Sequence, residues 1–222
     1  MNKSCYTFYI ILIFNTLITI SFPSTLSGLP KVKDKSDYLS GLEREVIMEL
    51  NLARSRPKKY AEFLVEYSKN FVGKELRESG QTNLLTNEGE IAVAEAIRFL
   101  KIQKPISIVT SSKGMSLAAG DMVRMQSNTT QTGHKGRDGS TFAERINRYG
   151  TWNGSCSENI DYGNNNARRI VMALIIDDGV PGRGHRKSIF EPRFKRVGIS
   201  FGSHKRYNYM CVIELAASYD EK

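Results

Sequence analysis

The chain has 222 residues, of which 40% are hydrophobic and 25% are charged, and its formal net charge is +9. This length and composition favour one domain with a substantial core over a disordered chain. The basic residues are scattered, and no spaced aromatics, zinc knuckles or heptads accompany them, so nucleic acid is not expected as a partner.

The N-terminal segment has the order of a secretory signal peptide. A lysine near the start precedes an apolar run from Phe8 to Phe22, and small residues follow the run. We predict a signal peptide over residues 1–25, a polar leader over 26–37 and secretion of the remaining chain. The alternative is an uncleaved membrane anchor, although the run is shorter than the roughly 20 residues that a spanning helix needs. No stable membrane span is expected after cleavage.

Secretion changes the interpretation of the cysteines. Cys5 lies in the predicted signal peptide, which leaves Cys156 and Cys211 in the mature chain. In an oxidising compartment these two thiols are predicted to form a disulfide, and the alternative is two reduced thiols. The glycosylation acceptor motifs at Asn128 and Asn153 agree with an extracellular location.

The predicted helices come first along the chain. Apolar residues recur at three- and four-residue steps from Leu39 to Ala53, which predicts a helix that Pro57 would end after Arg56. Further helices are predicted over 87–103, from a cap at Ser111 or Ser112 onward, over 141–149 and over 167–176.

After the last helix the apolar pattern changes to a period of two. Val197, Ile199 and Phe201 alternate with other residues, and so do the apolar residues from Tyr209 to Leu215. These segments are predicted to be neighbouring antiparallel strands, joined by a turn over 202–206. Helices followed by a small sheet favour an α+β fold built in layers.

Two acids directly follow the helix predicted over 167–176. Asp177 and Asp178 would lie at its C-terminal end, where unpaired carbonyls disfavour negative charge. Pro181-Gly182 suits the centre of a type II turn, which would bring His185 back toward these acids. The partner of the acids is then His185, or a cation held together with it.

A second histidine and acid lie earlier in the chain. His134 stands in a glycine-rich polar turn, and Glu158 follows Cys156. Two imidazoles and two carboxylates suit a divalent cation, and the nitrogens favour zinc. No HExxH or CxxC motif is present, and the alternative is a hydrogen-bonded network that fixes loops. His204 falls in the hairpin turn and is expected to be exposed.

At these residues the sequence resembles the CAP superfamily of cysteine-rich secretory proteins, antigen 5 and pathogenesis-related proteins, particularly its microbial SCP-like branch. The resemblance covers about residues 38–219, predicted as the CAP domain, and its motifs are specific when taken together. They are Glu49-Leu-Asn-Leu-Ala-Arg-Ser-Arg-Pro57, Gly133-His-Lys-Gly-Arg-Asp-Gly139, Cys156-Ser-Glu-Asn-Ile160, Asp177-Asp-Gly-Val-Pro-Gly-Arg-Gly-His-Arg186 and Tyr209-Met-Cys-Val-Ile213.

The resemblance implies a three-layer α-β-α sandwich with a cleft that holds two histidines and two acids. His134, His185 and Glu158 match three of these positions, and either Asp177 or Asp178 matches the fourth, which is usually glutamate. Ser157 replaces the family's glycine before Glu158, and the cysteine-rich tail of some members is missing. Channel-blocking roles associated with that tail are therefore not expected.

Members of the family differ in their roles, which include lipid binding, defence, protein partnering and claimed proteolysis, so the resemblance leaves the activity open. The leading hypothesis is a secreted binding protein, because the sequence shows the predicted tetrad and no obvious nucleophile. The cleft would hold a divalent cation, zinc or magnesium, and a lipid, a sterol or an extracellular protein would be the partner, in defence or in contact with a host or environment. The alternative is an extracellular, protease-like hydrolase, either metal-dependent or with His134 as general base oriented by Glu158 and with His185 as a further candidate. Ser155 and Ser157 are then possible nucleophiles. A third reading is a structural or adhesive domain.

Overall fold

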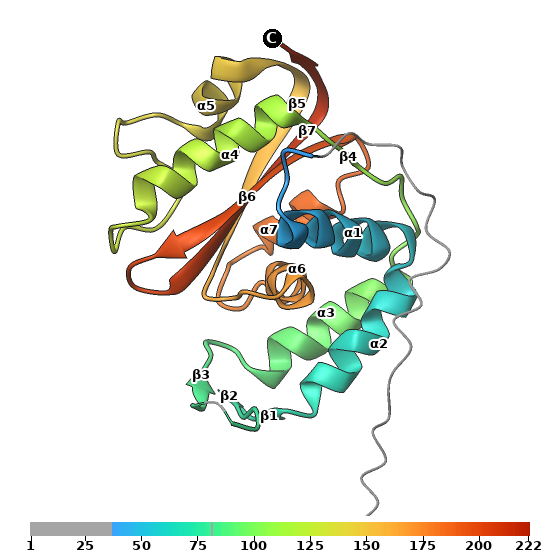
Figure 1. The fold of residues 1–222 in the computed structure, drawn as a ribbon. Coiled ribbons are helices and arrows are strands. Elements are labelled where there is room, and N and C mark those ends of the chain that lie inside the picture. The colour runs from blue at the N-terminus through green and yellow to red at the C-terminus, as the bar shows by residue number, and fades with distance from the viewer. Residues whose placement is uncertain (1–36, 81) are drawn as a thin grey trace, which may run out of the picture. The chain divides into compact units, whose positions relative to one another are not determined.

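A computed structural model describes residues 37–80 and 82–222 (Figure 1). The predicted signal peptide and residues 26–36 of the predicted leader lie outside this part of the chain. Within the described part, no helix is long and apolar enough to cross a membrane. The helices are α1 (Gly41–Ser55), α2 (Pro57–Ser68), α3 (Glu90–Ile102), α4 (Lys113–Gln126), α5 (Phe142–Tyr149), α6 (Ala167–Ile176) and α7 (Gly184–Ile189).

The central sheet has the strand order β4-β6-β7-β5. Its strands are β4 (Thr110–Ser111), β5 (Gly150–Tyr162), β6 (Arg196–His204) and β7 (Asn208–Glu221). The predicted hairpin is confirmed, because β6 and β7 pair antiparallel from Arg196↔Ala216 to His204↔Asn208. β5 pairs antiparallel with the other side of β7 and forms an edge of the sheet.

Helices cover both faces of this sheet (Figure 1). Alternate residues of β7 point to opposite faces: Ile213 and Leu215 join the core beside α1 and α6, whereas Val212 faces α4. Ala216 packs with residues of α4 and α5. The predicted α+β class and three-layer sandwich are therefore confirmed.

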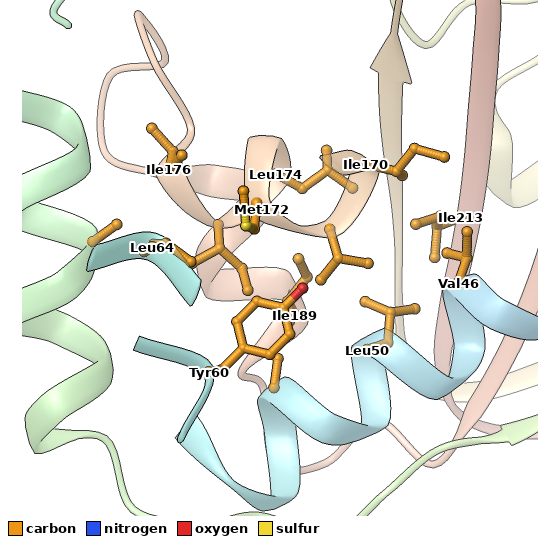
Figure 2. Packing of buried hydrophobic residues seen from close by; sticks show 14 of the residues in the cluster. Val46, Leu50, Tyr60, Leu64, Ile170, Met172, Leu174, Ile176, Ile189 and Ile213 are labelled. Atoms are coloured by element: carbon orange, nitrogen blue, oxygen red, sulfur yellow. The ribbon is translucent and has the colours of Figure 1, made fainter. Parts of the chain in front are cut away.

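α6 lies in the larger core and fixes the position of the residues that follow it (Figure 2). Its side chains contact α1, α2, α7 and the sheet, which explains why it is apolar on nearly every side. The labelled core residues around it include Val46, Leu50, Leu64, Ile189 and Ile213. Because all of these are buried, the C-terminal end of α6 is held firmly in the fold.

Local capping residues explain most of the helix starts. Ser40 and Glu43 form a capping box at α1, and the Ser112 side chain accepts from the Met115 amide at α4. Thr141 and Glu144 form a second capping box at α5. Pro57 follows the end of α1 as predicted, but it also occupies the first turn of α2, where its missing N–H costs nothing.

A small three-stranded sheet stands between α2 and α3. Its strands are β1 (Phe71–Val72), β2 (Glu75–Leu76) and β3 (Leu84–Leu85), paired antiparallel in the order β1-β2-β3. We call this unit the meander.

The predicted disulfide between Cys156 and Cys211 is wrong, because both cysteines are free. On β5 and β7 the register partner of Cys156 is Ala216, and that of Cys211 is Asp161. The two cysteines are thus separated by roughly 17 Å along the strands, whereas a disulfide needs Cα atoms about 4.4–6.8 Å apart. They also point to opposite faces of the sheet: Cys211 joins the core beside α6, and Cys156 packs near α4 and α5.

Candidate functional site

Asp177 ends α6 and turns its carboxylate toward the start of α7. It adopts the left-handed conformation with φ 59° and ψ 43°, which aspartate tolerates better than most residues. One carboxylate oxygen lies 2.7 Å from His185 Nδ1, and the other accepts the His185 amide at 2.9 Å. The acid therefore finds donors beyond the helix end, which offsets the unfavourable carbonyls behind it.

The predicted turn that brings His185 back is present. The Arg183 amide donates to the Val180 carbonyl at 3.1 Å across Pro181-Gly182, and Gly182 has φ 76°. A positive φ at the third residue is what a type II turn requires, and glycine supplies it without steric cost.

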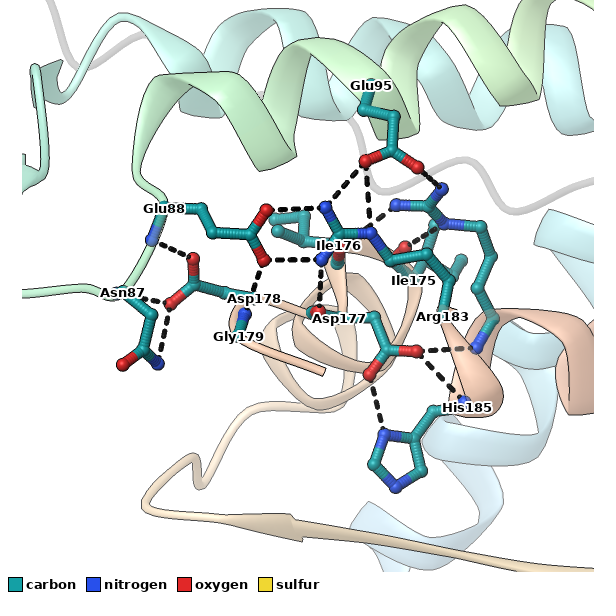
Figure 3. Close-up of polar contacts among 11 residues, drawn as sticks. Asn87, Glu88, Glu95, Ile175, Ile176, Asp177, Asp178, Gly179, Arg183 and His185 are labelled. Atoms are coloured by element: carbon teal, nitrogen blue, oxygen red, sulfur yellow. Dashed lines mark hydrogen bonds and ion pairs between the residues drawn. The ribbon is translucent and has the colours of Figure 1, made fainter. Parts of the chain in front are cut away.

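Asp178 points in another direction and does not join His185 (Figure 3). Its carboxylate accepts the amides of Asn87 and Glu88, each at 2.7 Å, just before α3. Glu88 in turn accepts the Gly179 amide at 2.7 Å. The two consecutive acids thus have different partners: Asp177 holds His185, and Asp178 ties the α6 end to the segment before α3.

Two arginines, one at the end of the turn and one in α7, stabilise this end of α6. The Arg186 side chain is buried and donates to the carbonyls of Ile175 and Ile176. Arg183 donates to the Asp177 carbonyl at 2.8 Å, and its guanidinium also binds Glu88 and Glu95 (Figure 3). Cations at a helix C-terminus compensate the exposed carbonyls. The sequence did not indicate these roles, because Glu88 and Glu95 come from a distant helix and its preceding loop.

His134 forms the second histidine–carboxylate pair. Its Nδ1 lies 2.8 Å from Oε1 of Glu158, which stands on β5. The other oxygen of Glu158 accepts from Arg145 of α5 at 2.5 Å. Arg145 also donates to the His134 and Ser140 carbonyls at 3.2 and 3.1 Å. The side chains of Arg145 and Glu158 are both fully buried, so this ion pair is shielded from water.

Tyr162 and His204 hold the loop that carries His134 in place through hydrogen bonds to its backbone. The Tyr162 hydroxyl accepts the Gly133 amide at 3.0 Å, and His204 Nε2 donates to the Gln131 carbonyl at 2.9 Å. The expectation that His204 is exposed is wrong: only 2% of its surface is accessible. The ring packs against Tyr162, which a hairpin turn seen in sequence alone does not reveal.

The two pairs bring their imidazoles next to each other. The ring centroids of His134 and His185 lie 6.3 Å apart, and the rings are tilted by 40°. The His134 side chain is 50% exposed and that of His185 is 23% exposed, whereas the side chains of Glu158 and Asp177 are 0% and 1% exposed. Each accessible imidazole therefore contacts a buried carboxylate. Of the sequence-predicted site residues, His134, Glu158, Asp177 and His185 come together, and we call them the tetrad.

The hydrogen bonds at Nδ1 determine which chemistry the tetrad can offer. A ring that donates its Nδ1 proton to a carboxylate keeps a lone pair on Nε2. Within residues 37–80 and 82–222, neither Nε2 has a hydrogen-bond partner. The rings could thus supply two nitrogens to a cation, with the carboxylates as orienting partners. In the same part of the chain, no three His, Cys, Asp or Glu residues form a group that could hold a metal ion.

Glu214 is a further buried acid beside the tetrad that the sequence did not indicate. It stands on β7 directly opposite Glu158. Burial, and then the negative charge of Glu158, hold the pKa of Glu214 well above its usual range. Its environment therefore favours the neutral form of the Glu214 carboxyl over the charged form.

The two candidate serine nucleophiles do not engage an imidazole. The Ser157 hydroxyl accepts from Ser188 at 2.9 Å, which ties β5 to α7. The Ser155 hydroxyl is buried without a hydrogen-bond partner among the described residues. A serine nucleophile needs a base within hydrogen-bond reach, and neither serine has such a contact with His134 or His185 in the described part of the chain.

Comparisons with known proteins give a family match and two distant structural similarities. A sequence model of the cysteine-rich secretory protein family, CAP, matches residues 93–215, which is more than half of the chain. An outer surface protein from Borrelia burgdorferi is 14% identical, with a TM-score of 0.43 over 53% of this chain and 80% of that one.

The second similar structure is an extracellular protein containing a SCP domain from Bacillus anthracis str. Ames. It is 13% identical, with a TM-score of 0.41 over 57% of this chain and 39% of that one. A search of curated proteins returned no match.

Proposed function

Because the chain belongs to the cysteine-rich secretory protein (CAP) family, we propose that it is a secreted binding protein whose tetrad holds a divalent cation. The observation that carries this proposal is the repeated geometry of His134 with Glu158 and His185 with Asp177, at 2.8 and 2.7 Å. A carboxylate behind each imidazole fixes the tautomer with Nε2 free for a metal and raises the basicity of the ligand.

Zinc is the cation that the donors fit best. Imidazole nitrogens favour zinc over magnesium, which prefers oxygen ligands and keeps much of its water. The carboxylates already accept from the Arg145 guanidinium or from the His185 and Arg186 amides, so the nitrogens remain as the available ligands. A bound zinc would supply Lewis acidity and lower the pKa of a bound water.

Secretion is part of the same proposal. It is supported by the family and by the order of basic start, apolar run and small residues before residue 25, which lies outside the described part of the chain. A lipid is the partner class that we favour, because an apolar cavity opens between the meander and α6. A hydrolase with a serine nucleophile is not favoured, because neither Ser155 nor Ser157 contacts an imidazole in the described part of the chain.

The neighbouring acids Asp177 and Asp178 provide a matched pair of variants for testing the cation site. We expect Asp177→Asn to weaken zinc binding about 10- to 100-fold, because the variant removes the carboxylate that orients His185. Asp178→Asn should change the zinc Kd less than about twofold, because Asp178 contacts Asn87 and Glu88 instead. Zinc affinity is measured by competition with a chelating dye, on variants whose fold is checked by circular dichroism. Equal affinities of the two folded variants would contradict an orienting role for Asp177.

A further inference from the structure

A second cavity, separate from the tetrad, lies between the meander, α2, α3 and α6. Its volume is 230 Å³, and most of its lining is apolar. The apolar lining residues include Tyr67, Phe71, Leu76, Leu84, Met172 and Ile176. Asp178 also lines this cavity. The two acids after α6 therefore belong to different sites: Asp177 contacts His185 in the tetrad, and Asp178 borders the cavity.

One polar group of the cavity lining is a guanidinium whose charge is already balanced. Arg169 of α6 lines the cavity and forms two contacts of 3.1 Å with the carboxylate of Glu78. Its guanidinium also stacks 4.2 Å from the centre of the Tyr67 ring. Both members of the ion pair are about three-quarters buried. The pair therefore offers donors and acceptors with no net charge.

The opening of the cavity is apolar and accessible. Leu84 both lines the cavity and is 58% exposed, and its neighbour Leu85 is 77% exposed. Val72 on β1 is also exposed. Exposed single apolar residues are common, but several on one small sheet beside an apolar cavity indicate a place where an apolar ligand enters.

The volume and charge of the cavity select the ligand. A cavity of about 150 Å³ lined by apolar residues holds benzene, so 230 Å³ suits a molecule somewhat larger than one aromatic ring and is too small to enclose a sterol. An anionic head would gain little from a guanidinium that Glu78 already neutralises, and it would have to be desolvated. A hydroxyl can bond to the pair without bringing a new charge.

We propose that this cavity binds one small neutral amphiphile, such as a medium-chain alcohol, with its apolar part between the meander and α6 and its hydroxyl at the Arg169–Glu78 pair. The inference rests on the lipid-binding part of the proposed function and names the class of ligand. It is independent of the cation at the tetrad.

Calorimetry with 1-octanol tests the inference, in the presence of a chelator so that the tetrad plays no part. The secreted protein should bind one equivalent of 1-octanol saturably, and octanoate at least tenfold more weakly. Ala173→Phe fills the cavity from α6 and should abolish binding. Ala143→Phe adds the same ring on α5, on the other face of the sheet, and should bind like the parent.

If Ala173→Phe does not fold, a variant with an altered preference between octanol and octanoate still tests the inference. Glu78→Gln leaves the Arg169 charge unbalanced, so the preference should shift at least tenfold from octanol toward octanoate. The inference is overturned if the folded parent shows no saturable octanol binding, if folded Ala173→Phe binds like the parent, if Glu78→Gln leaves the preference unchanged, or if cholesterol competes with octanol for the cavity. Retained zinc binding by the same protein would show that only the cavity assignment had failed.

Discussion

Replacing Arg145 by methionine is expected to lower the free energy of unfolding by about 3–5 kcal/mol, because the change leaves the buried Glu158 carboxylate without its charged partner. Methionine keeps most of the side-chain volume, so the loss comes mainly from the charge and from the bonds to the His134 and Ser140 carbonyls. Urea unfolding measures the difference.

Two further variants isolate the cause of that loss. Arg148→Met on the same helix removes ion pairs to Asp121 and Asp138 from a side chain that is 38% exposed, and it should cost no more than about 1 kcal/mol. Arg145→Met combined with Glu158→Gln should be less destabilising than Arg145→Met alone, since no unpaired charge remains. A double variant that loses the sum of both single effects would show that the ion pair itself is not the source.

Replacing Asp161 by asparagine is expected to make the protein more stable at pH 8 and to change the pH dependence of stability. Asp161 is buried on β5, and burial raises its pKa to about 7 despite two contacts from Asn164 and the positive charge of Arg169. Between its unfolded pKa near 3.8 and its folded pKa near 7, the folded state holds a proton that the unfolded state has lost. The contribution of Asp161 to the free energy of unfolding therefore has its full value below about pH 3.8. It is lost as the pH rises to about 7.

The size of this effect follows from the linkage between protons and folding. One proton corresponds to about 1.4 kcal/mol per pH unit, so the group accounts for about 4 kcal/mol across the window. Asparagine keeps an oxygen for the Asn164 donor and does not titrate. We expect the stability difference between Asp161→Asn and the parent to grow from pH 4 to 7 and then to level off, measured by urea unfolding at several pH values. Asp220→Asn, at an exposed position of β7, serves as the control, and equal slopes for Asp161→Asn and the parent would contradict the account.

The local parts of the fold could be predicted from the sequence because their causes are local. The apolar run of α6, its end at Ile176 and the turn at Pro181-Gly182 each depend on residues a few positions apart. The hairpin of β6 and β7 is likewise encoded by alternation on both sides of one turn.

The features of the fold that the sequence did not predict depend on contacts between distant segments of the chain. β5 is polar and rich in small residues, and its strand conformation comes from pairing with β7 rather than from its own pattern. Arg145 lies in a polar stretch of α5 that suggests an exposed helix, and only Glu158 on the next strand explains its burial. The predicted disulfide was wrong for the same reason, because the register of β5 against β7 places the two thiols on opposite faces of the sheet.

The sequence also could not determine which of Asp177 and Asp178 pairs with His185. Both acids follow α6, and the sequence offered either as the partner of His185. The left-handed backbone of Asp177 directs its carboxylate to α7, while Asp178 contacts the amides before α3. Backbone conformation at one residue therefore decided which acid joined the tetrad.

A calorimetric zinc titration of the protein from Pro30 onward, beside His134→Ala/His185→Ala, tests the central claim most directly. It should be done near neutral pH, where imidazoles are mostly neutral and free to bind metal. We predict saturable binding of one zinc by the parent and none by the double variant. A folded parent that binds no zinc would contradict the claim, and the tetrad would then be a hydrogen-bonded network that fixes the His134 and His185 loops.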